Sequence, residues 1–176
     1  TRTIFHEATH QIFSETRKMR NRKAALVGVN GNFWIIEGIA CYMESLRERD
    51  GMYTLGGFDN PRMVAAHYHL ANPKRFFVHL EELTSLDIQR FQKHPNIAKL
   101  YSQGTGVASF LMHHDGGRYR PALMQYLRDV YHGVDTRHSL AKHTGVSFDQ
   151  LDREYIEYML DGMRRAKAKI IQANQG

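Results

Sequence analysis

Apolar side chains recur at intervals of three and four along most of the chain, which is the period of an amphipathic helix. In residues 3–20 the apolar or semi-apolar positions are Ile4, Phe5, Ala8, Ile12, Phe13 and Met19. In residues 33–49 they are Ile35, Ile36, Ile39, Tyr42, Met43 and Leu46. Asp50-Gly51 follows as a stop signal. Both segments are therefore predicted to be helices.

Further helical segments follow the turn-rich stretch 51–61. The first is predicted to begin after Asn60, with Pro61 at its first position, and to end near Asn72-Pro73. The others are predicted over 79–92 (a weak pattern), 97–114 (interrupted by two glycines), 118–132, 139–143 and 148–171. Ser147 suits the N-cap of the last helix. Residues 24–32 are predicted as a loop or short strand, and sustained strand alternation is missing, so the predicted fold class is mainly α.

Composition narrows the classes of protein to consider. The 176 residues suit one domain, and 42% of them are hydrophobic, which is enough to build a core. No run of eighteen apolar residues exists, so no transmembrane segment is expected in this chain. The single cysteine, Cys41, excludes an internal disulfide and a Cys-rich zinc site.

The net charge of +6 is partly clustered at Arg17–Lys23 and Arg164–Lys169. A basic protein can bind nucleic acid, but stacking aromatics do not interleave with these clusters. We therefore expect a solvated helix end and a solvated C-terminal tail, and no nucleic-acid partner.

Residues 6–11 read His-Glu-Ala-Thr-His-Gln and carry the candidate chemistry. Histidines at i and i+4 lie on one helix face, a spacing that suits two corners of a zinc tetrahedron. Glu7, between them, is placed to take a proton from a water that zinc has made more acidic. The alternative is a pair of ordinary histidines beside an ordinary acid. The apolar flanks Ile4-Phe5 and Ile12-Phe13 favour the metal site, because they predict a buried helix whose polar groups need partners.

Glu37 is the candidate third ligand, because it is a carboxylate in the first turn of a strongly apolar helix. The small residues Gly38 and Ala40 would let this helix approach the His-Glu-His helix closely. Glu44, seven residues on, lies on the same side and could orient a ligand histidine from behind. The alternatives are a capping carboxylate for Glu37 and a solvated face for Glu44.

The His-Glu-x-x-His-Gln segment followed by Trp-x-x-Glu-Gly-x-Ala-x-Tyr resembles the gluzincin (peptidase MA-like) zinc metallopeptidases, including a group of bacterial domains of unknown function. The resemblance implies His6, His10 and Glu37 as zinc ligands and Glu7 as general base. It also implies Tyr101, 64 residues after Glu37, as a donor to the developing oxyanion. Weaker alternatives to Tyr101 are Gln103, His67, His69 and His113. The 26 residues between His10 and Glu37 exceed the gap in better-known members.

The resemblance predicts a single gluzincin-like domain fragment over 1–176. Residues 1–50 would form the zinc-site helices and 51–176 a helical C-terminal lobe, with the family's upstream β-sheet missing from the fragment. The expected activity is zinc-dependent hydrolysis of a peptide or protein substrate. The alternative is a catalytically inactive zinc-binding structural or interaction domain. The location stays open, because a lone cysteine fits the cytoplasm, while peptidases of this kind are often exported or anchored to bacterial envelopes, with the targeting segment then outside this chain. Oligomeric state stays open as well.

Overall fold

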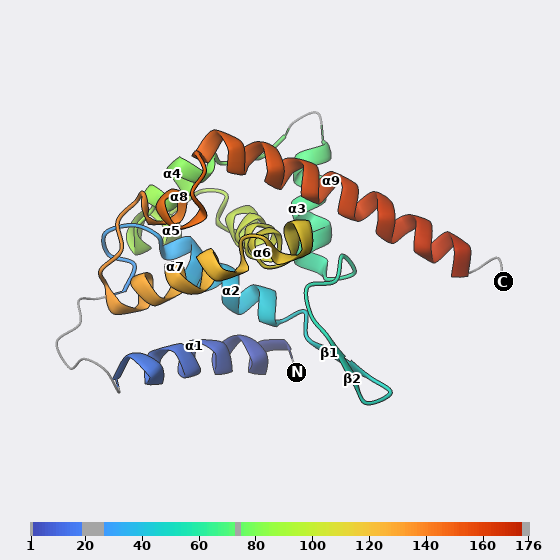
Figure 1. Cartoon of the computed structure of the whole chain (residues 1–176), viewed down its shortest axis with the longest axis horizontal. Helices are drawn as coiled ribbons and strands as arrows, with labels where there is room; N and C mark the ends of the chain where they lie inside the picture. Colours follow the sequence, from blue (N-terminus) through green and yellow to red (C-terminus); the bar gives the residue numbers. More distant parts are fainter. Residues whose placement is uncertain (1, 19–26, 73–74, 174–176) are drawn as a thin grey trace.

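The computed structural model describes residues 2–18, 27–72 and 75–173, and over these residues the chain is mainly helical, as predicted (Figure 1). The helices are α1 (Arg2–Lys18), α2 (Phe33–Met43), α3 (Pro61–Ala71), α4 (Leu80–Ser85), α5 (Ile88–Gln92), α6 (Ile97–His113), the 3-10 helix η1 (His114–Gly117), α7 (Arg120–His132), α8 (Ser139–Thr144) and α9 (Phe148–Ala173). Within the described residues the one sheet is an antiparallel ribbon of β1 (Arg47–Arg49) and β2 (Met52–Thr54). The described helices include none with the length and apolar character needed to span a membrane.

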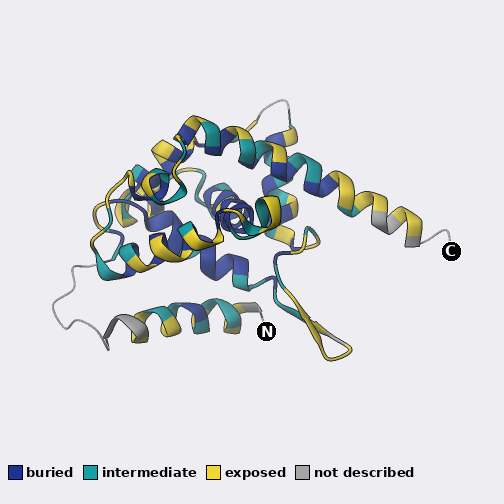
Figure 2. Ribbon diagram, in the orientation of Figure 1, coloured by how far each residue is buried: buried dark blue, intermediate teal, exposed yellow. Residues whose placement is uncertain are grey.

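Helix α6 lies at the centre of the molecule, and α2 packs along it (Figure 1, Figure 2). In α2 only Glu37 and Met43 are not buried, and Glu37 is the helix's one charged residue. A helix that is covered on every side needs apolar residues on every face, which explains why α2 has almost no polar side. The result is a single carboxylate on a helix that otherwise belongs to the core.

Helices α2 and α6 meet backbone to backbone at Gly38 and Gly104. A Cβ atom on Gly38 would lie 2.8 Å from the carbonyl oxygen of Gly104, closer than real Cβ atoms come. The prediction that Gly38 brings α2 close to α1 is therefore wrong, because Gly38 faces α6. Helix α6 runs without a break from Ile97 to His113, so its two glycines do not interrupt it as predicted. Gly106 lies at a close contact between helices, because a Cβ there would lie 2.7 Å from the Tyr155 hydroxyl.

Helix α2 ends at Met43, six residues before the predicted end at 49, because the chain turns into the β1–β2 ribbon. The Ser45 hydroxyl donates to the carbonyl of Tyr42 (2.6 Å) and accepts from the backbone N–H of Gly56 (2.7 Å). Asp50 and Gly51 have φ of 53° and 76°, the left-handed pair that closes a two-residue hairpin. The Asp-Gly signal therefore marks a hairpin turn, and its use as a helix stop was wrong.

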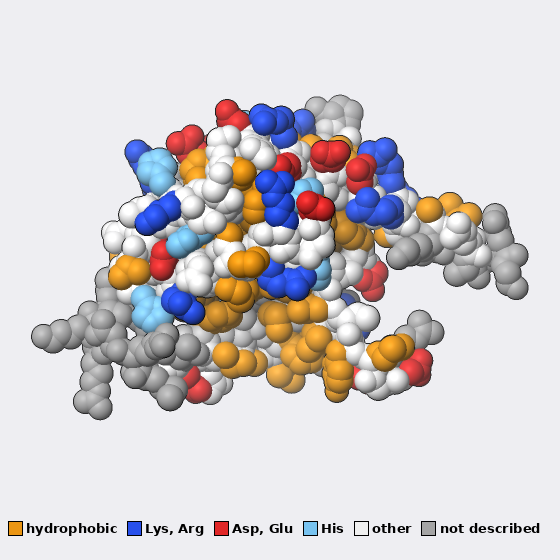
Figure 3. Space-filling view, viewed as in Figure 1, with side chains coloured by type: hydrophobic (Ala, Val, Ile, Leu, Met, Phe, Trp, Pro, Cys, Tyr) orange, Lys and Arg blue, Asp and Glu red, His pale blue; other side chains and the backbone are white. Residues whose placement is uncertain are grey.

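Helix α1 lies along the outside of α2 and also contacts α7. Thr9 is buried, and the Phe13 ring stacks on the Tyr131 ring of α7 with centroids 4.7 Å apart. Ile4 and Ile12, predicted to help bury this helix, are instead 67% and 63% exposed. Apolar side chains are visible along the lower edge of Figure 3, where α1 and the ribbon lie. The packed face of α1 therefore carries the histidines rather than the isoleucines.

The remaining segments mostly follow the predicted pattern. Asn60 caps α3, and Ser147 caps α9 by accepting from the backbone N–H of Gln150 at 3.2 Å. The weak segment 79–92 is split into α4 and α5, because Asp87 caps a new helix by accepting from the backbone N–H of Arg90. The basic residues at 164, 165 and 167 are exposed on α9, although they belong to a helix rather than a tail. Residues 19–26, with most of the first basic cluster and Met19, lie outside the described residues.

Replacing Gly38 with alanine should lower the free energy of unfolding by about 1–3 kcal/mol, because the new methyl group meets the backbone of α6. Gly104→Ala is the matched control on the facing helix. Its Cβ would lie 3.4 Å from the nearest atom, an ordinary contact, and alanine gains roughly 1 kcal/mol of helix propensity. Chemical denaturation of both variants measures the difference. Equal destabilisation by the two substitutions would contradict the assigned contact.

Candidate metal centre

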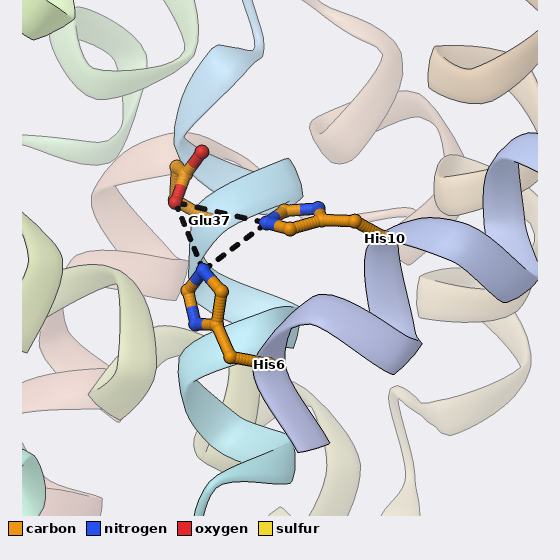
Figure 4. Close-up of side chains that lie close together, drawn as sticks. All are labelled: His6, His10 and Glu37. Carbon is orange, nitrogen blue, oxygen red and sulfur yellow. Dashed lines mark hydrogen bonds and ion pairs between the residues drawn. The ribbon is translucent and has the colours of Figure 1, made fainter. Parts of the chain in front are cut away.

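Two histidines and a glutamate meet where α1 lies against α2 (Figure 4). The Nε2 atoms of His6 and His10 are 3.1 Å apart. Glu37 Oε2 lies 3.6 Å from His6 Nε2 and 3.9 Å from His10 Nε2. The i, i+4 spacing on α1 turns both imidazoles toward α2, where Glu37 faces them. The structure thus brings together the three residues that the sequence predicts as ligands.

The spacing of these three atoms suits one small cation. Ligand atoms about 2.0–2.1 Å from zinc at the corners of a tetrahedron lie about 3.3–3.4 Å apart. The observed separations of 3.1, 3.6 and 3.9 Å bracket that edge length. The Nε2 atoms of His6 and His10 are within hydrogen-bond distance, so one proton between them, or a cation among all three atoms, relieves the repulsion of lone pairs in this partly buried site. The residues present therefore fit a tetrahedral zinc ion with three protein ligands.

Glu37 does not act as a helix cap. With α2 beginning at Phe33, no acidic residue lies in its first turn, so the predicted first-turn position was wrong. The Glu37 side chain is 13% exposed, so it is largely shielded from water. Helix α2 has no basic residue that could pair with it. A carboxylate held this way needs a partner across the interface, and the facing helix offers two imidazoles.

Glu44 holds the far side of the His6 ring. Its Oε1 lies 2.9 Å from His6 Nδ1, and its Oε2 lies 3.4 Å from Arg62 Nε. Since a carboxylate accepts, His6 donates from Nδ1–H, which leaves the Nε2 lone pair free to face Glu37 and His10. Carboxylates behind ligand histidines fix ring orientation and tautomer in metal sites. The alternative that Glu44 lies on a solvated face is wrong.

Cys41 forms a second possible ligand group with His6 and Glu44. Its Sγ lies 3.8 Å from His6 Nδ1, the nitrogen that already faces Glu44. Burial raises the pKa of the Cys41 thiol to about 12, against an opposing effect of the Arg62 charge. Metal binding there would require a buried thiol to ionise and His6 to give up its bond to Glu44. The site formed by the two Nε2 atoms and Glu37 needs neither change.

Glu7, the predicted general base, is exposed on the edge of the packed face of α1. At about 100° per residue, its side chain lies roughly 100° from His6 and 60° from His10 around the helix axis. Thr9 and Phe13, which pack against the protein, lie on the opposite flank. Glu7 therefore borders the histidines on the flank of α1 that stays open to solvent.

Tyr101 lies close to the three candidate ligands, on α6. Its hydroxyl accepts a hydrogen bond from Gln92 Nε2 at 3.4 Å. Burial raises the pKa of Tyr101, the Gln92 bond opposes this, and the charge of Glu37 raises it further. The structure therefore brings Tyr101 near Glu37, while the described hydrogen bond of its hydroxyl is the one from Gln92.

Two of the weaker alternatives to Tyr101, Gln103 and His113, have hydrogen-bond partners elsewhere. Gln103 bonds both the N–H and the carbonyl of Val78, at 3.0 and 2.5 Å. His113 Nε2 lies 2.7 Å from the Tyr42 hydroxyl, and burial together with the Arg120 charge lowers the pKa of His113. Burial is also the main cause that lowers the pKa values of His67 and His69 on α3. These side chains serve the packing around α6 and α3.

Two residues near the site were missed from the sequence. Arg62 pairs with Glu44, and its guanidinium carbon lies 5.4 Å from the centre of the Tyr101 ring. Tyr131 is 5% exposed, and its buried hydroxyl has no hydrogen-bond partner in the described part of the structure. Burial raises the pKa of Tyr131, and the Glu37 charge raises it further. No local pattern marks either residue, because each comes near the site through contacts between distant helices.

Two surface cavities of about 330 and 250 Å³ lie away from His6, His10 and Glu37. The larger is lined by residues 113–115 and by α9, and the smaller by residues 75–79 and the start of α9. Comparison of this chain with protein-family models, curated proteins and solved structures gave no match. The case for a functional site therefore rests on the side-chain geometry where α1 meets α2.

Tyr131→Phe should raise the free energy of unfolding of the metal-free protein by about 1 kcal/mol, because it removes an unpaired buried hydroxyl. Tyr126→Phe on the same helix is the matched control. Its hydroxyl donates to Asn32 Oδ1 (2.5 Å) and accepts from Trp34 Nε1 (3.1 Å). We expect that control to lose about 1–3 kcal/mol in thermal or urea unfolding. Similar losses in both variants would mean that Tyr131 has a partner that the described contacts do not include.

Glu44→Gln should weaken zinc binding about 10–100-fold, because the amide no longer holds the Nδ1–H of His6 as a charged acceptor. Glu154→Gln is the control, since Glu154 lies 3.6 Å from His114 and 3.8 Å from Arg118 in a similar cluster elsewhere. Competition with a chromophoric chelator gives the zinc dissociation constant of each variant. Unchanged zinc affinity in Glu44→Gln would remove Glu44 from the site.

Proposed function

We propose that this chain is a zinc-dependent hydrolase of peptide bonds, with zinc held by His6, His10 and Glu37. The observation that carries the proposal is the near-tetrahedral spacing of two imidazole nitrogens and one carboxylate oxygen, at 3.1, 3.6 and 3.9 Å. Three protein ligands with one position left for water or substrate are typical of catalytic zinc sites, whereas structural sites use four. Glu7 beside the ligands adds a base, which a purely structural site does not need.

A zinc ion held by these side chains would polarise the scissile carbonyl and supply a nucleophilic water near neutral pH. Glu7 would take one proton from that water as the water oxygen attacks the carbonyl carbon. It would deliver this proton to the amide nitrogen as the C–N bond breaks, and the second proton of the water would follow to the amine, so that a carboxylate and an ammonium group leave. The exposed position of Glu7 lets its carboxylate meet both water and substrate.

Two further side chains support this chemistry. Glu44 fixes the His6 ring so that Nε2, rather than Nδ1, faces the ligand position. The Tyr101 hydroxyl, a donor beside Glu37, can turn to the oxyanion that develops on the substrate carbonyl. In these roles Glu44 acts as a hydrogen-bond acceptor and Tyr101 as a hydrogen-bond donor.

A zinc-binding domain without turnover is the second candidate. It is favoured by the hydrogen bond from Gln92 to the Tyr101 hydroxyl (3.4 Å), which already gives that hydroxyl a partner within the protein. The two candidates share the zinc ligands and differ in the use of Glu7. A variant that keeps zinc but alters Glu7 therefore separates them.

The decisive experiment compares wild type, Glu37→Ala and Glu7→Gln by elemental analysis and by hydrolysis of a fluorogenic peptide library. Wild type should carry about one zinc per chain and cleave peptides, because three ligands suffice for a catalytic site. Glu37→Ala should lose the metal. Glu7→Gln should keep it, with the rate lowered by about 10²–10⁴-fold.

Glu15→Gln is the control, because Glu15 lies exposed on the same helix and bonds Gln11. It should leave metal content and rate unchanged. Zinc retained in Glu37→Ala would refute the ligand set. Zinc bound without any cleavage would support the second candidate instead.

A further inference from the structure

Arg62 is held rigidly at the start of α3. Its backbone N–H donates to the side chain of Asn60, which is 2% exposed, at 2.8 Å. Pro61 occupies the first position of the helix and fixes φ there. The Arg62 side chain therefore starts from a backbone that is fixed by a buried cap.

Two side chains, Glu44 and Tyr101, lie between the guanidinium of Arg62 and the candidate ligands. Its Nε lies 3.4 Å from Glu44 Oε2, and Glu44 in turn binds His6. Its guanidinium carbon lies 5.4 Å from the centre of the Tyr101 ring, and Tyr101 lies near enough to Glu37 for the carboxylate charge to raise its pKa. Its charge also lowers the pKa of Cys41, on the same face of α2, against the larger effect of burial. The cation thus borders the site from the side of α3.

Pairing with Glu44 does not use all the hydrogen-bond donors of the Arg62 side chain. The Arg62 side chain is 35% exposed, while the Glu44 side chain is 15% exposed. Only Nε faces Glu44, and in the described residues the terminal nitrogens Nη1 and Nη2 have no acceptor. Those two nitrogens are the donors that bind a carboxylate in parallel, which is the geometry that distinguishes arginine from lysine.

We propose that Arg62 binds the free carboxyl terminus of the peptide substrate, one or two residues beyond the scissile bond. The substrates would then be peptides cut near their C-terminal end. The path from the ligands crosses the His6 ring and two contacts of 2.9 and 3.4 Å. Extended peptide covers about 3.3–3.6 Å per residue, and the carbonyl at the metal and the hydrogen bond to Arg62 extend that reach at its two ends, so one or two residues span this path. This inference rests on the proposed zinc-dependent peptidase function.

The test uses thiol probes that bind zinc through sulfur and differ only at the carboxyl end. The probes are mercaptoacetyl-phenylalanine, mercaptoacetyl-phenylalanyl-alanine and the carboxamide of each. Calorimetry on the zinc-loaded full chain measures their dissociation constants. In wild type at least one acid should bind about 10–100-fold more tightly than its amide, the range of a charge-assisted pair.

In Arg62→Gln the preference for the acid should disappear while the affinity for the amide stays the same. Arg62→Lys should keep part of the preference, since it retains charge without the paired donors. Arg118→Gln is the matched control, because Arg118 also lies over a tyrosine ring (5.1 Å to Tyr119) and beside a glutamate (3.8 Å to Glu154). It should bind all four probes as wild type does.

Equal binding of acids and amides by wild type would overturn the inference, and so would an unchanged acid preference in both Arg62 variants. Zinc-loaded protein that binds none of the probes would also overturn it. In these cases a zinc content near one per chain leaves the proposed function standing. A chain that takes up no zinc overturns both, and elemental analysis distinguishes that failure from the others.

Discussion

The contact between the backbones of α2 and α6 is the constraint on which the site depends. Gly38 allows an approach to the backbone of Gly104 that a single methyl group on Gly38 would prevent. With α2 pressed into the core, its residues outside the α6 contact have to face α1 or solvent. Glu37, Cys41 and Glu44 recur at four and three residues and form the face that meets α1. The rigid core thus holds Glu37 and Glu44 against α1, a helix that the rest of the protein covers on one side only.

Around this face the polar side chains form a chain of contacts. His6 bonds Glu44, Glu44 pairs with Arg62, and Arg62 lies over Tyr101. On the other side of its ring, His6 faces Glu37. Four helices contribute: α1, α2, α3 and α6. Such a network fixes the orientation of each ring and carboxylate more firmly than any single pair would. It offers a metal a preorganised set of ligands, so little ordering has to accompany binding.

Local patterns were enough to predict the helices and the three potential ligands. His6 and His10 are one turn apart, and a lone carboxylate in an apolar helix is visible without a structure. The β1–β2 ribbon was missed because Asp50-Gly51 signals either a helix stop or a tight hairpin, and the partner strand decides which. Arg62 and Tyr131 lie 25 and 94 residues from Glu37 along the chain. They were missed because only packing between helices brings them near it.

The orientation of α1 is itself an argument for function. The helix turns Ile4 and Ile12 outward, at 67% and 63% exposure, and turns His6, Thr9 and His10 toward α2. Burying an isoleucine is worth about 1.5–3 kcal/mol, so hydrophobic burial alone would favour the reverse orientation within this pair of helices. A helix that turns its apolar residues to solvent and its polar residues to the protein is typical of a functional site. An unpaired Tyr131 hydroxyl near Glu37 adds a second cost at the same place. A cation bound among His6, His10 and Glu37 would offset the first cost, because it would bind the polar atoms that α1 and α2 turn toward each other in place of buried isoleucines.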